Sequence, residues 1–317
     1  MLYWDKIGKI FDPSCSGLKW MREYAQLPYP FLYNNNTVRV YFATRPQRGS
    51  NLQYISRSGY IDIDRSDLTQ IVNIGKKPIF DLGNPGSFDE FGCMTSSIIQ
   101  HKKIIYAYYT GWSRLATVPY TMAIGLAISQ DNGLSFKKIS EGPILGQTID
   151  EPFLLSGPKV LIIDGLWHMW YLVGVKWLSY DTKFEPVYKI AHATSFDGIK
   201  WSRNGIPILP SIYENECQVS FSVFKYHNKW NAIFAYRQPL DFRKTKSNTY
   251  RLGYAWSDDL ITWHRDDKQL EIDLPEDGWD SEMMAYPQVS EIDGEIYLFY
   301  CGNNFGQKGF GIAKLIK

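Results

Sequence analysis

A short phrase that recurs at a nearly constant spacing constrains the fold of this chain more than any other feature. Each copy has Ser and Asp two positions apart and ends in an aromatic residue, and the copies span residues 129–136, 195–201 and 257–263. Asp, Asn and Gly favour turns, and the aromatic residue can cover the joint, so each copy predicts a hairpin. The copies begin 66 and then 62 residues apart. A period of this length indicates a repeat architecture.

Aromatic-rich strands keep the same step and occur five times, as VRVYFATR, IIYAYYTGW, LWHMWYLVG, WNAIFAYR and IYLFYCG. With 317 residues, each of five units has about 63 residues, which is enough for four strands and their loops. Four-stranded units arranged around an axis form a β-propeller. The sequence therefore predicts an all-β fold, a five-bladed β-propeller in which residues 1–317 form a single domain.

The two ends of the chain complement each other. Residues 4–11 resemble the outer strand that follows each hairpin phrase, whereas residues 309–314 resemble the third strand of a blade. The last blade thus lacks its outer strand, and the N-terminal segment can supply it. We expect this strand to close the ring, because closure removes an exposed sheet edge.

Charge and composition exclude several classes of protein. The chain has 34 Lys and Arg against 33 Asp and Glu, so no basic excess exists to follow nucleic acid or an acidic membrane surface. No window approaches the roughly 20 consecutive apolar residues of a membrane helix, and the first residues lack the features of a secretory signal. We expect a soluble, cytoplasmic protein with no nucleic-acid or membrane partner, and the sequence leaves its oligomeric state open.

Cysteine and histidine spacing predicts neither a metal site nor a cofactor. The four cysteines are scattered without a CxxC pair, and the five histidines are isolated. We expect four reduced thiols, most of them buried. Aromatic residues reach 16% of the chain, which suits strands and offers flat rings for carbohydrate.

Acidic residues recur where each blade enters its innermost strand. One glutamate from each copy keeps the blade period, and the five are Glu23, Glu90, Glu151, Glu216 and Glu282. Quasi-symmetry predicts that they converge at one end of the central channel and face inward. Carboxylates that cluster raise one another's pKa, so cations have to lie near them. The alternative is an ion-paired ring that only holds one blade to the next.

Side chains near these glutamates complete the predicted pocket. Arginines at or shortly after the ends of inner strands can bind anionic or hydroxyl groups, and Trp112 can form a wall. The predicted substrate-binding residues are Glu23, Arg45, Asp89, Glu90, Trp112, Asp150, Arg237, Arg243 and Asp280. Cleavage of a glycosidic bond needs two carboxyl groups, one protonated and one ionised, and a ring of acids can provide them. The chain has no GxSxG nucleophile elbow and no phosphate-binding loop.

The whole chain resembles a known superfamily. The motifs FDEFGCMTSSII, DEPFLLSGPKV, ENECQVSFSVF, YRLGYAWSDDLITWHRDD, GWDSEMMAYPQV and GNNFGQKGFGIA, on a five-bladed pattern, are similar to those of five-bladed propeller glycosidases. That superfamily includes glycoside hydrolase families 32, 43, 117 and 130. The motifs resemble most closely the "glycosylase" propellers encoded among surface-polysaccharide biosynthesis genes. The resemblance implies a glycoside hydrolase, phosphorylase or glycosyl-transferring enzyme of polysaccharide metabolism, acting in a central acidic pocket on a carbohydrate or sugar phosphate.

The resemblance also suggests roles for single residues. Families 32 and 43 carry a catalytic Asp directly before an inner-strand Pro, but Tyr29, Gly157 and Tyr286 stand there in this chain. The pair Glu216-Cys217 resembles the Glu-Cys pair of family 32, which implies that Glu216 is the general acid. Glu151 or Glu282 would then activate the attacking water or phosphate. The alternatives are an inactive propeller that binds a sugar or a biosynthetic partner, and a protein-interaction scaffold.

Overall fold

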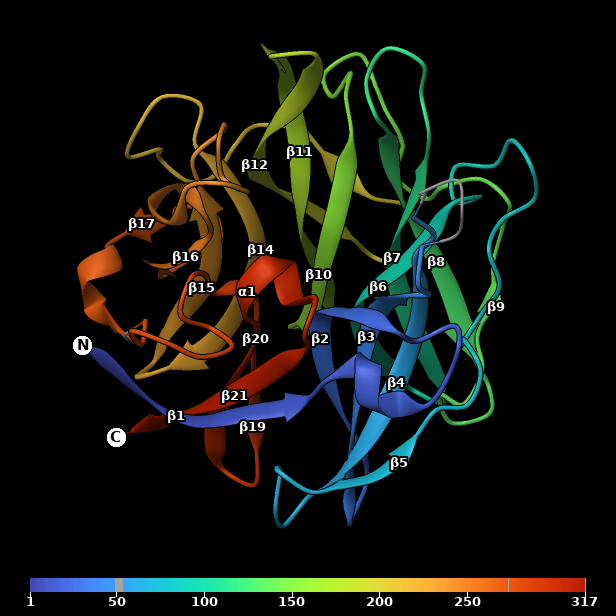
Figure 1. The fold of residues 1–317 in the computed structure, drawn as a ribbon, viewed down its shortest axis with the longest axis vertical. Helices are drawn as coiled ribbons and strands as arrows, with labels where there is room; N and C mark the ends of the chain where they lie inside the picture. Colours follow the sequence, from blue (N-terminus) through green and yellow to red (C-terminus); the bar gives the residue numbers. More distant parts are fainter. Residues whose placement is uncertain (49–53, 273, 317) are drawn as a thin grey trace.

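The computed structural model of the chain describes residues 1–48, 54–272 and 274–316. Its strands form five sheets (Figure 1). The innermost strands of these sheets contact one another in a closed circle, in the order β2, β6, β10, β14, β19 and back to β2. The fold is therefore the predicted five-bladed β-propeller, and each sheet is one blade.

Each blade runs outward from its innermost strand. Blade 1 comprises β2 (Glu23–Asn34), β3 (Thr37–Arg45), β4 (Arg57–Asp64) and β5 (Ile71–Ile74). Blade 2 comprises β6 (Gly92–His101), β7 (Ile104–Ser113), β8 (Thr121–Ser129) and β9 (Lys137–Lys138). Blade 3 comprises β10 (Leu155–Ile163), β11 (Leu166–Tyr180), β12 (Lys183–Ser195) and β13 (Ser202–Arg203). Blade 4 comprises β14 (Cys217–Tyr226), β15 (Lys229–Arg237), β16 (Arg251–Ser257) and β17 (His264–Arg265).

The fifth blade contains both ends of the described chain. It comprises β19 (Ala285–Ile292), β20 (Glu295–Cys301), β21 (Phe310–Ile316), β1 (Leu2–Phe11) and β18 (Leu270–Glu271). Strand β1 pairs antiparallel with β21, so that Trp4 lies opposite Leu315. The predicted closure by the N-terminal strand is confirmed. Sequence reasoning missed β18, a two-residue strand that pairs in parallel with the start of β1.

Short helical segments connect the strands. They are the 3-10 helices η1 (Pro13–Ser16), η2 (Lys246–Asn248) and η3 (Asp267–Gln269), and the helical turn α1 (Asn303–Gly306). No helix in the described ranges is long and apolar enough to cross a membrane.

The recurrent phrase forms the predicted hairpin between the third and fourth strands. In the copy of blade 3, Asp197 accepts hydrogen bonds from the backbone N–H groups of Ile199 and Lys200, both at 2.8 Å. These bonds hold the pKa of Asp197 below its ordinary value. The indole of Trp201 donates to the carbonyl of Gly198 at 3.2 Å. Local turn chemistry thus explains why a short phrase repeats with the blades.

Buried side chains and a few polar bonds hold neighbouring blades together. Clusters of buried aromatic and aliphatic residues span the joints between blades. Arg39 of blade 1 is buried and donates to Asp62 at 2.7 Å and to the carbonyl of Gly133, in the β8–β9 hairpin of blade 2, at 3.2 Å. The four cysteines are free, and three of them are buried.

Candidate functional site

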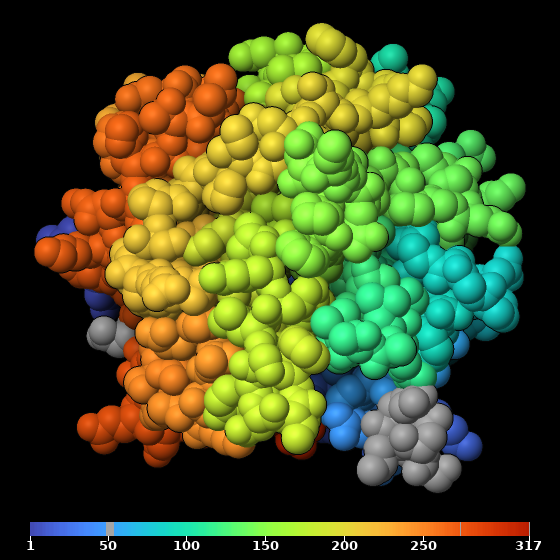
Figure 2. Space-filling model, turned by 90° about the horizontal axis from the view of Figure 1, so that it is seen from above, coloured from blue at the N-terminus to red at the C-terminus, as the bar shows by residue number. Residues whose placement is uncertain are grey.

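All five blades contribute residues to one cavity of about 840 Å³, which therefore lies on the axis of the ring. Its walls come from the ends of strands and from long connections after the second strands. One wall is the tip of the β11–β12 hairpin, and another is the segment before β8. Their side chains Trp177 and Tyr120 pack with ring centroids 5.7 Å apart. Figure 2 shows this hairpin in yellow-green beside that segment in blue-green on the face of the molecule seen from above.

Cations and aromatic rings dominate the described lining of the cavity. The positively charged residues are Arg45, Arg48, Lys183, Arg237 and Arg243. The aromatic residues are Tyr24, Tyr54, Trp112, Tyr120, Phe184, Tyr188, Phe242, Tyr250, Tyr286 and Phe305. Glu185 is the one carboxylate among the described lining residues. The prediction of an acidic pocket is therefore wrong, because the cavity carries an excess of positive charge.

Arg45 ends β3 and lies between two tyrosine rings. Its guanidinium carbon is 4.5 Å from the ring centre of Tyr24 and 4.4 Å from that of Tyr54. Its Nε atom is buried and has no hydrogen-bond partner in the described structure. Burial lowers the pKa of Arg45 from its ordinary value. The group is thus desolvated by aromatic neighbours without being neutralised by a carboxylate.

Arg237 occupies the corresponding position at the end of β15 and is only 3% exposed. Its Nε donates to the hydroxyl of Tyr188 at 3.0 Å, and its Nη1 donates to the carbonyls of Gln238 and Pro239 at 2.8 and 3.2 Å. Its guanidinium lies 3.5 Å from the ring centre of Phe242. None of the described carboxylates forms an ion pair with Arg237.

Two contacts join the long β11–β12 hairpin to the connection after β15. Arg243 forms an ion pair with Glu185 of the hairpin. The hydroxyl of Tyr180, near the hairpin tip, donates to Asp241. These contacts place Glu185 at the wall of the cavity and fix the side chain that could act as an acid there. Sequence reasoning missed Glu185, since the hairpin extends beyond the repeated part of the blade.

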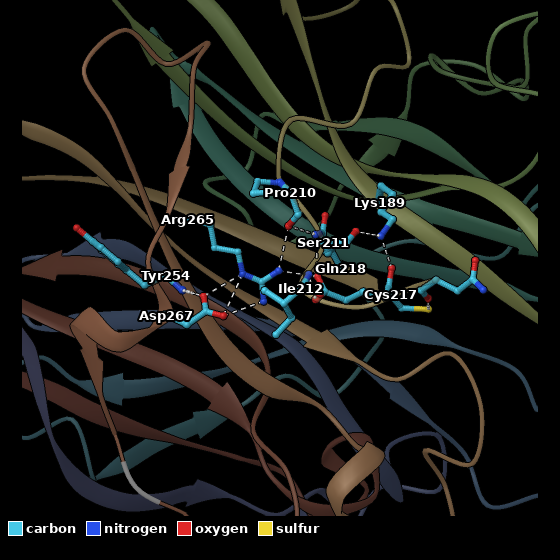
Figure 3. A network of polar contacts seen from close by, with 11 residues as sticks. Lys189, Pro210, Ser211, Ile212, Cys217, Gln218, Tyr254, Arg265 and Asp267 are labelled. Atoms are coloured by element: carbon cyan, nitrogen blue, oxygen red, sulfur yellow. Dashed lines mark hydrogen bonds and ion pairs between the residues drawn. The ribbon is translucent and has the colours of Figure 1, made fainter.

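The predicted ring of inward glutamates does not form, and that prediction is wrong. None of the five glutamates lines the cavity in the described structure. Glu216 is fully buried beside blade 4, where Arg265 Nη1 lies 2.7 Å away and Gln218 donates at 2.8 Å. Figure 3 shows this network around Arg265, which also binds Asp267. Glu151 is buried in the same manner, 2.9 Å from Arg203.

The buried acids form a repeated structural unit instead. In three blades an acid near the blade entry accepts a hydrogen bond from a tyrosine 20 residues later and pairs with a cation of the outer strand. The sets are Asp89 with Tyr109 and Lys138, Glu151 with Tyr171 and Arg203, and Asp280 with Tyr300 and Lys6. In blade 4 Glu216 pairs with Arg265, which lies over the ring of Tyr236. The sequence period located this unit, but a period cannot show which way a side chain points.

The remaining predicted acids lie outside the cavity. Asp150 and Glu282 are exposed, and Glu90 accepts a hydrogen bond from the backbone of Gly86 at 2.9 Å. Glu23 lies opposite Arg45 in the β2–β3 ladder, with no ion pair between their described side chains. Of the predicted substrate-binding residues, four line the cavity, namely Arg45, Trp112, Arg237 and Arg243. The functional roles of all these residues stay predictions.

Three cavity tyrosines were also missed from the sequence. Tyr188 and Tyr250 hydrogen-bond to each other through their hydroxyls, and Tyr286 packs 5.7 Å from Tyr250. The departure at Tyr286-Pro287, where families 32 and 43 carry Asp, was the signal for the third. No group of three or more His, Cys, Asp or Glu side chains in the described ranges is arranged to hold a metal ion.

Comparisons with known proteins place this geometry in context. No protein-family model matches the chain. The chain is 33% identical to the uncharacterized protein Rv1502 of Mycobacterium tuberculosis over 98% of this chain and 99% of that protein. It is 24% identical to a 1,2-β-oligomannan phosphorylase of Thermoanaerobacter sp. over 58% of this chain and 55% of that enzyme.

Solved structures show the same fold at low sequence identity. A glycoside hydrolase has a TM-score of 0.75 and 16% identity, covering 98% of this chain and 92% of its own. A structure from work on the GH130 family of mannoside phosphorylases and glycoside hydrolases has a TM-score of 0.68 and 16% identity, covering 98% and 93%. A thermostable family-43 glycoside hydrolase has a TM-score of 0.62 and 14% identity, covering 95% and 90%.

Proposed function

This chain belongs to one family with the mycobacterial protein Rv1502 and has the fold of five-bladed propeller glycoside hydrolases, and we propose on this basis that it is a carbohydrate-active enzyme. The proposed reaction is hydrolysis, phosphorolysis or transfer at a glycosidic bond. The observation that carries the proposal is the axial cavity, which has the size of a small-molecule site and aromatic walls contributed by several blades. Aromatic rings suit the apolar faces of sugars.

Glu185 is the carboxyl group that we propose as the acid of this cavity, once ligand binding releases it from its ion pair with Arg243. It is the one carboxylate in the described lining, and its partner Arg243 lies in the same wall. Glycosidases of the usual kind need a second carboxyl group as base or nucleophile. Phosphorolysis needs only the acid, because phosphate itself attacks the sugar. The excess of cations and the name of the Thermoanaerobacter relative support a reaction in which phosphate or a sugar phosphate takes part.

Paired variants test this assignment against the role of Glu216. The purified protein is incubated with a panel of disaccharides, with and without inorganic phosphate, and released sugar and sugar 1-phosphate are quantified. We expect Glu185→Gln to lower turnover by at least about 100-fold, the scale of a lost general acid. A Glu185→Gln variant with normal turnover, beside a folded but inactive Glu216→Gln variant, would return the role to Glu216.

A second candidate is an inactive propeller that binds sugar. It is favoured by the ion pairs of Glu151 and Glu216, which engage two of the three carboxylates assigned to catalysis from the sequence. Saturable sugar binding without turnover of any panel member would support this candidate. In either case we place the protein in cytoplasmic polysaccharide metabolism as a hypothesis, which localisation of the protein in its own cells would check.

A further inference from the structure

The cavity contains two desolvated arginines that lack the partner such groups normally have. Elsewhere in the described structure Arg39, Arg203 and Arg265, whose side chains are 2%, 12% and 3% exposed, each contact a carboxylate within 3 Å. Arg45 and Arg237 contact aromatic rings instead, and neither forms an ion pair with a described carboxylate. Taking a charge out of water without an opposite charge is costly. A ligand that brings negative charge would remove this cost.

The tyrosine pair beside Arg237 has one hydroxyl hydrogen that the bond within the pair does not use. The hydroxyls of Tyr188 and Tyr250 bond to each other, and Tyr188 also accepts from Arg237 at 3.0 Å. Two phenols carry two hydrogens, and their mutual bond uses one of them, whichever residue donates. Burial raises the pKa of both residues, so both hydrogens are retained at neutral pH. One O–H group thus remains to donate to a ligand.

Tyr286 lies in the blade between those that carry Arg45 and Arg237. It belongs to β19, lines the cavity and has a backbone φ of +53°, in the left-handed region that non-glycine residues rarely adopt. A bulge with the same positive φ recurs in other innermost strands, at Leu27, Gly157 and Ser220, so this backbone conformation belongs to the blade repeat. Burial raises the pKa of Tyr286 well above its ordinary value, while the charges of both arginines act to lower it. Its hydroxyl is therefore a retained donor within the field of both cations.

These side chains have one chemical property in common, since they offer hydrogen-bond donors and positive charge but no acceptor-only group. A neutral sugar hydroxyl both donates and accepts, so it does not require such a set. An oxyanion only accepts, and arginine binds phosphate and carboxylate with its planar fork.

We propose that Arg45, Arg237 and Tyr286, together with the Tyr188–Tyr250 pair, form a subsite for an oxyanion, and that this oxyanion is a phosphate group borne by the carbohydrate ligand. A phosphate ester presents three terminal oxygens to donors that come from four blades, whereas a carboxylate presents two. The inference rests on the proposed function for the sugar part of the ligand only. The same subsite chemistry would also admit a uronate carboxylate or free phosphate, and the experiment separates these sources.

Titration calorimetry on the full chain tests the subsite. The four probes are glucose 1-phosphate, inorganic phosphate, glucuronate and glucose, at constant ionic strength. We expect glucose 1-phosphate to bind at least about tenfold more tightly than any other probe. Arg45→Gln and Arg237→Gln should each weaken it by about 10- to 100-fold, the equivalent of one charge-assisted hydrogen bond. Tyr286→Phe, which removes only the hydroxyl, should weaken it by about three- to tenfold.

A matched variant controls for the loss of charge alone. Arg65→Gln removes a cation whose partner, Asp293, lies with it outside the cavity, and it should leave binding unchanged. Arg45→Lys and Arg237→Lys keep the charge but lose the fork, so partial binding is expected from both. Circular dichroism melts establish that each variant is folded before it is titrated.

Several results would overturn the proposal. Tighter binding of glucuronate would assign the subsite to carboxylate, and tighter binding of inorganic phosphate would assign it to a free co-substrate. Equal binding of glucose 1-phosphate by wild type and the folded Arg45→Gln and Arg237→Gln variants would remove these residues from the subsite. Failure of the proposed enzyme function looks different: glucose 1-phosphate then binds through these residues, and no glycoside is turned over.

Discussion

Buried charges are handled in opposite ways at the blade entries and in the axial cavity. At the blade entries, Glu151 and Glu216 are each matched by an arginine of the outer strand. In the cavity, Arg45 and Arg237 have aromatic neighbours and no described carboxylate. A matched pair is self-sufficient and holds strands together, whereas an unmatched charge is costly until something binds it. The difference separates the charges that maintain this fold from those that await a ligand.

The largest expected effect comes from deleting residues 1–11, which removes a strand and a matching charge together. The deletion takes away β1, leaves β21 as an open edge and leaves Asp280 without Lys6. We expect it to remove most of the free energy of unfolding, which is about 5–15 kcal/mol in most proteins. Urea denaturation followed by tryptophan fluorescence measures the free energy of unfolding. Lys6→Gln, which removes only the charge, is the control; equal stability of the deletion and the full chain would contradict closure.

Breaking one matched pair in blade 4 should have the next largest effect. Glu216→Gln preserves shape and leaves Arg265 with Asp267 as its remaining carboxylate partner, so we expect a loss of about 1–3 kcal/mol in unfolding free energy. The double variant Glu216→Gln with Arg265→Gln also deprives Asp267 of its partner, so it should be less stable than the single variant. A single variant as stable as wild type would show that the pair does not hold the blade together.

Lys159 is a buried cation that, unlike the arginines, can lose its proton, and it leads to a prediction about pH. This lysine is buried in the central channel, where its Nζ atom donates to Gln288 at 2.7 Å, and burial lowers its pKa to about 7. The folded state therefore binds fewer protons than the unfolded state between about pH 7 and the ordinary lysine pKa near 10.4. Stability should rise with pH across that window, by up to about 1.4 kcal/mol per pH unit from this group.

The measurement compares wild type with Lys159→Met at several pH values between 7 and about 10. As the pH rises, the unfolding free energy of wild type should increase relative to that of Lys159→Met. A constant difference would mean that Lys159 keeps its proton. Arginine keeps its proton throughout this pH range, so Arg45 and Arg237 cannot avoid the cost of a buried charge by becoming neutral.

The smallest effect on stability is expected from the unmatched arginines. Arg237→Gln removes a buried charge that has no described carboxylate partner, so we expect the unfolding free energy to change by no more than about 1 kcal/mol in either direction. The matched Arg265→Gln variant should lose several times more. Thermal melts of the two proteins side by side check the contrast, and equal losses would erase the distinction between the two regions.

The sequence predicted those parts of the structure that depend on local chemistry. The Ser-x-Asp phrases form hairpins through their own backbone contacts, and the complementary ends predicted the pairing of β1 with β21. Arg45 and Arg237 were found because each ends a repeated strand. These features could be predicted because each depends on neighbours in the sequence or on a fixed period.

The sequence could not predict the direction of the acidic side chains. In blades 2 and 5 the buried acid is Asp89 or Asp280, whereas the neighbouring Glu90 and Glu282 make no ion pair with a described cation. Partners such as Lys138 lie about 50 residues away in the chain, and only the folded sheet brings them together. Glu185 escaped notice because the β11–β12 hairpin is longer than its counterparts and has no repeat there.

The pairing of β1 with β21 also sets an order of events during synthesis. A ribosome produces about 5–20 residues per second, so β1 waits for tens of seconds before β21 emerges. During that time the apolar side of β1, including Trp4, has no sheet to pack against. Blades 1 to 4 do not contain β1, so their sheets can form before β21 is made. The last blade can form only after β21 has emerged from the ribosome. Until then β1 is an unpaired strand with exposed apolar side chains, which is the kind of segment that aggregates or binds chaperones.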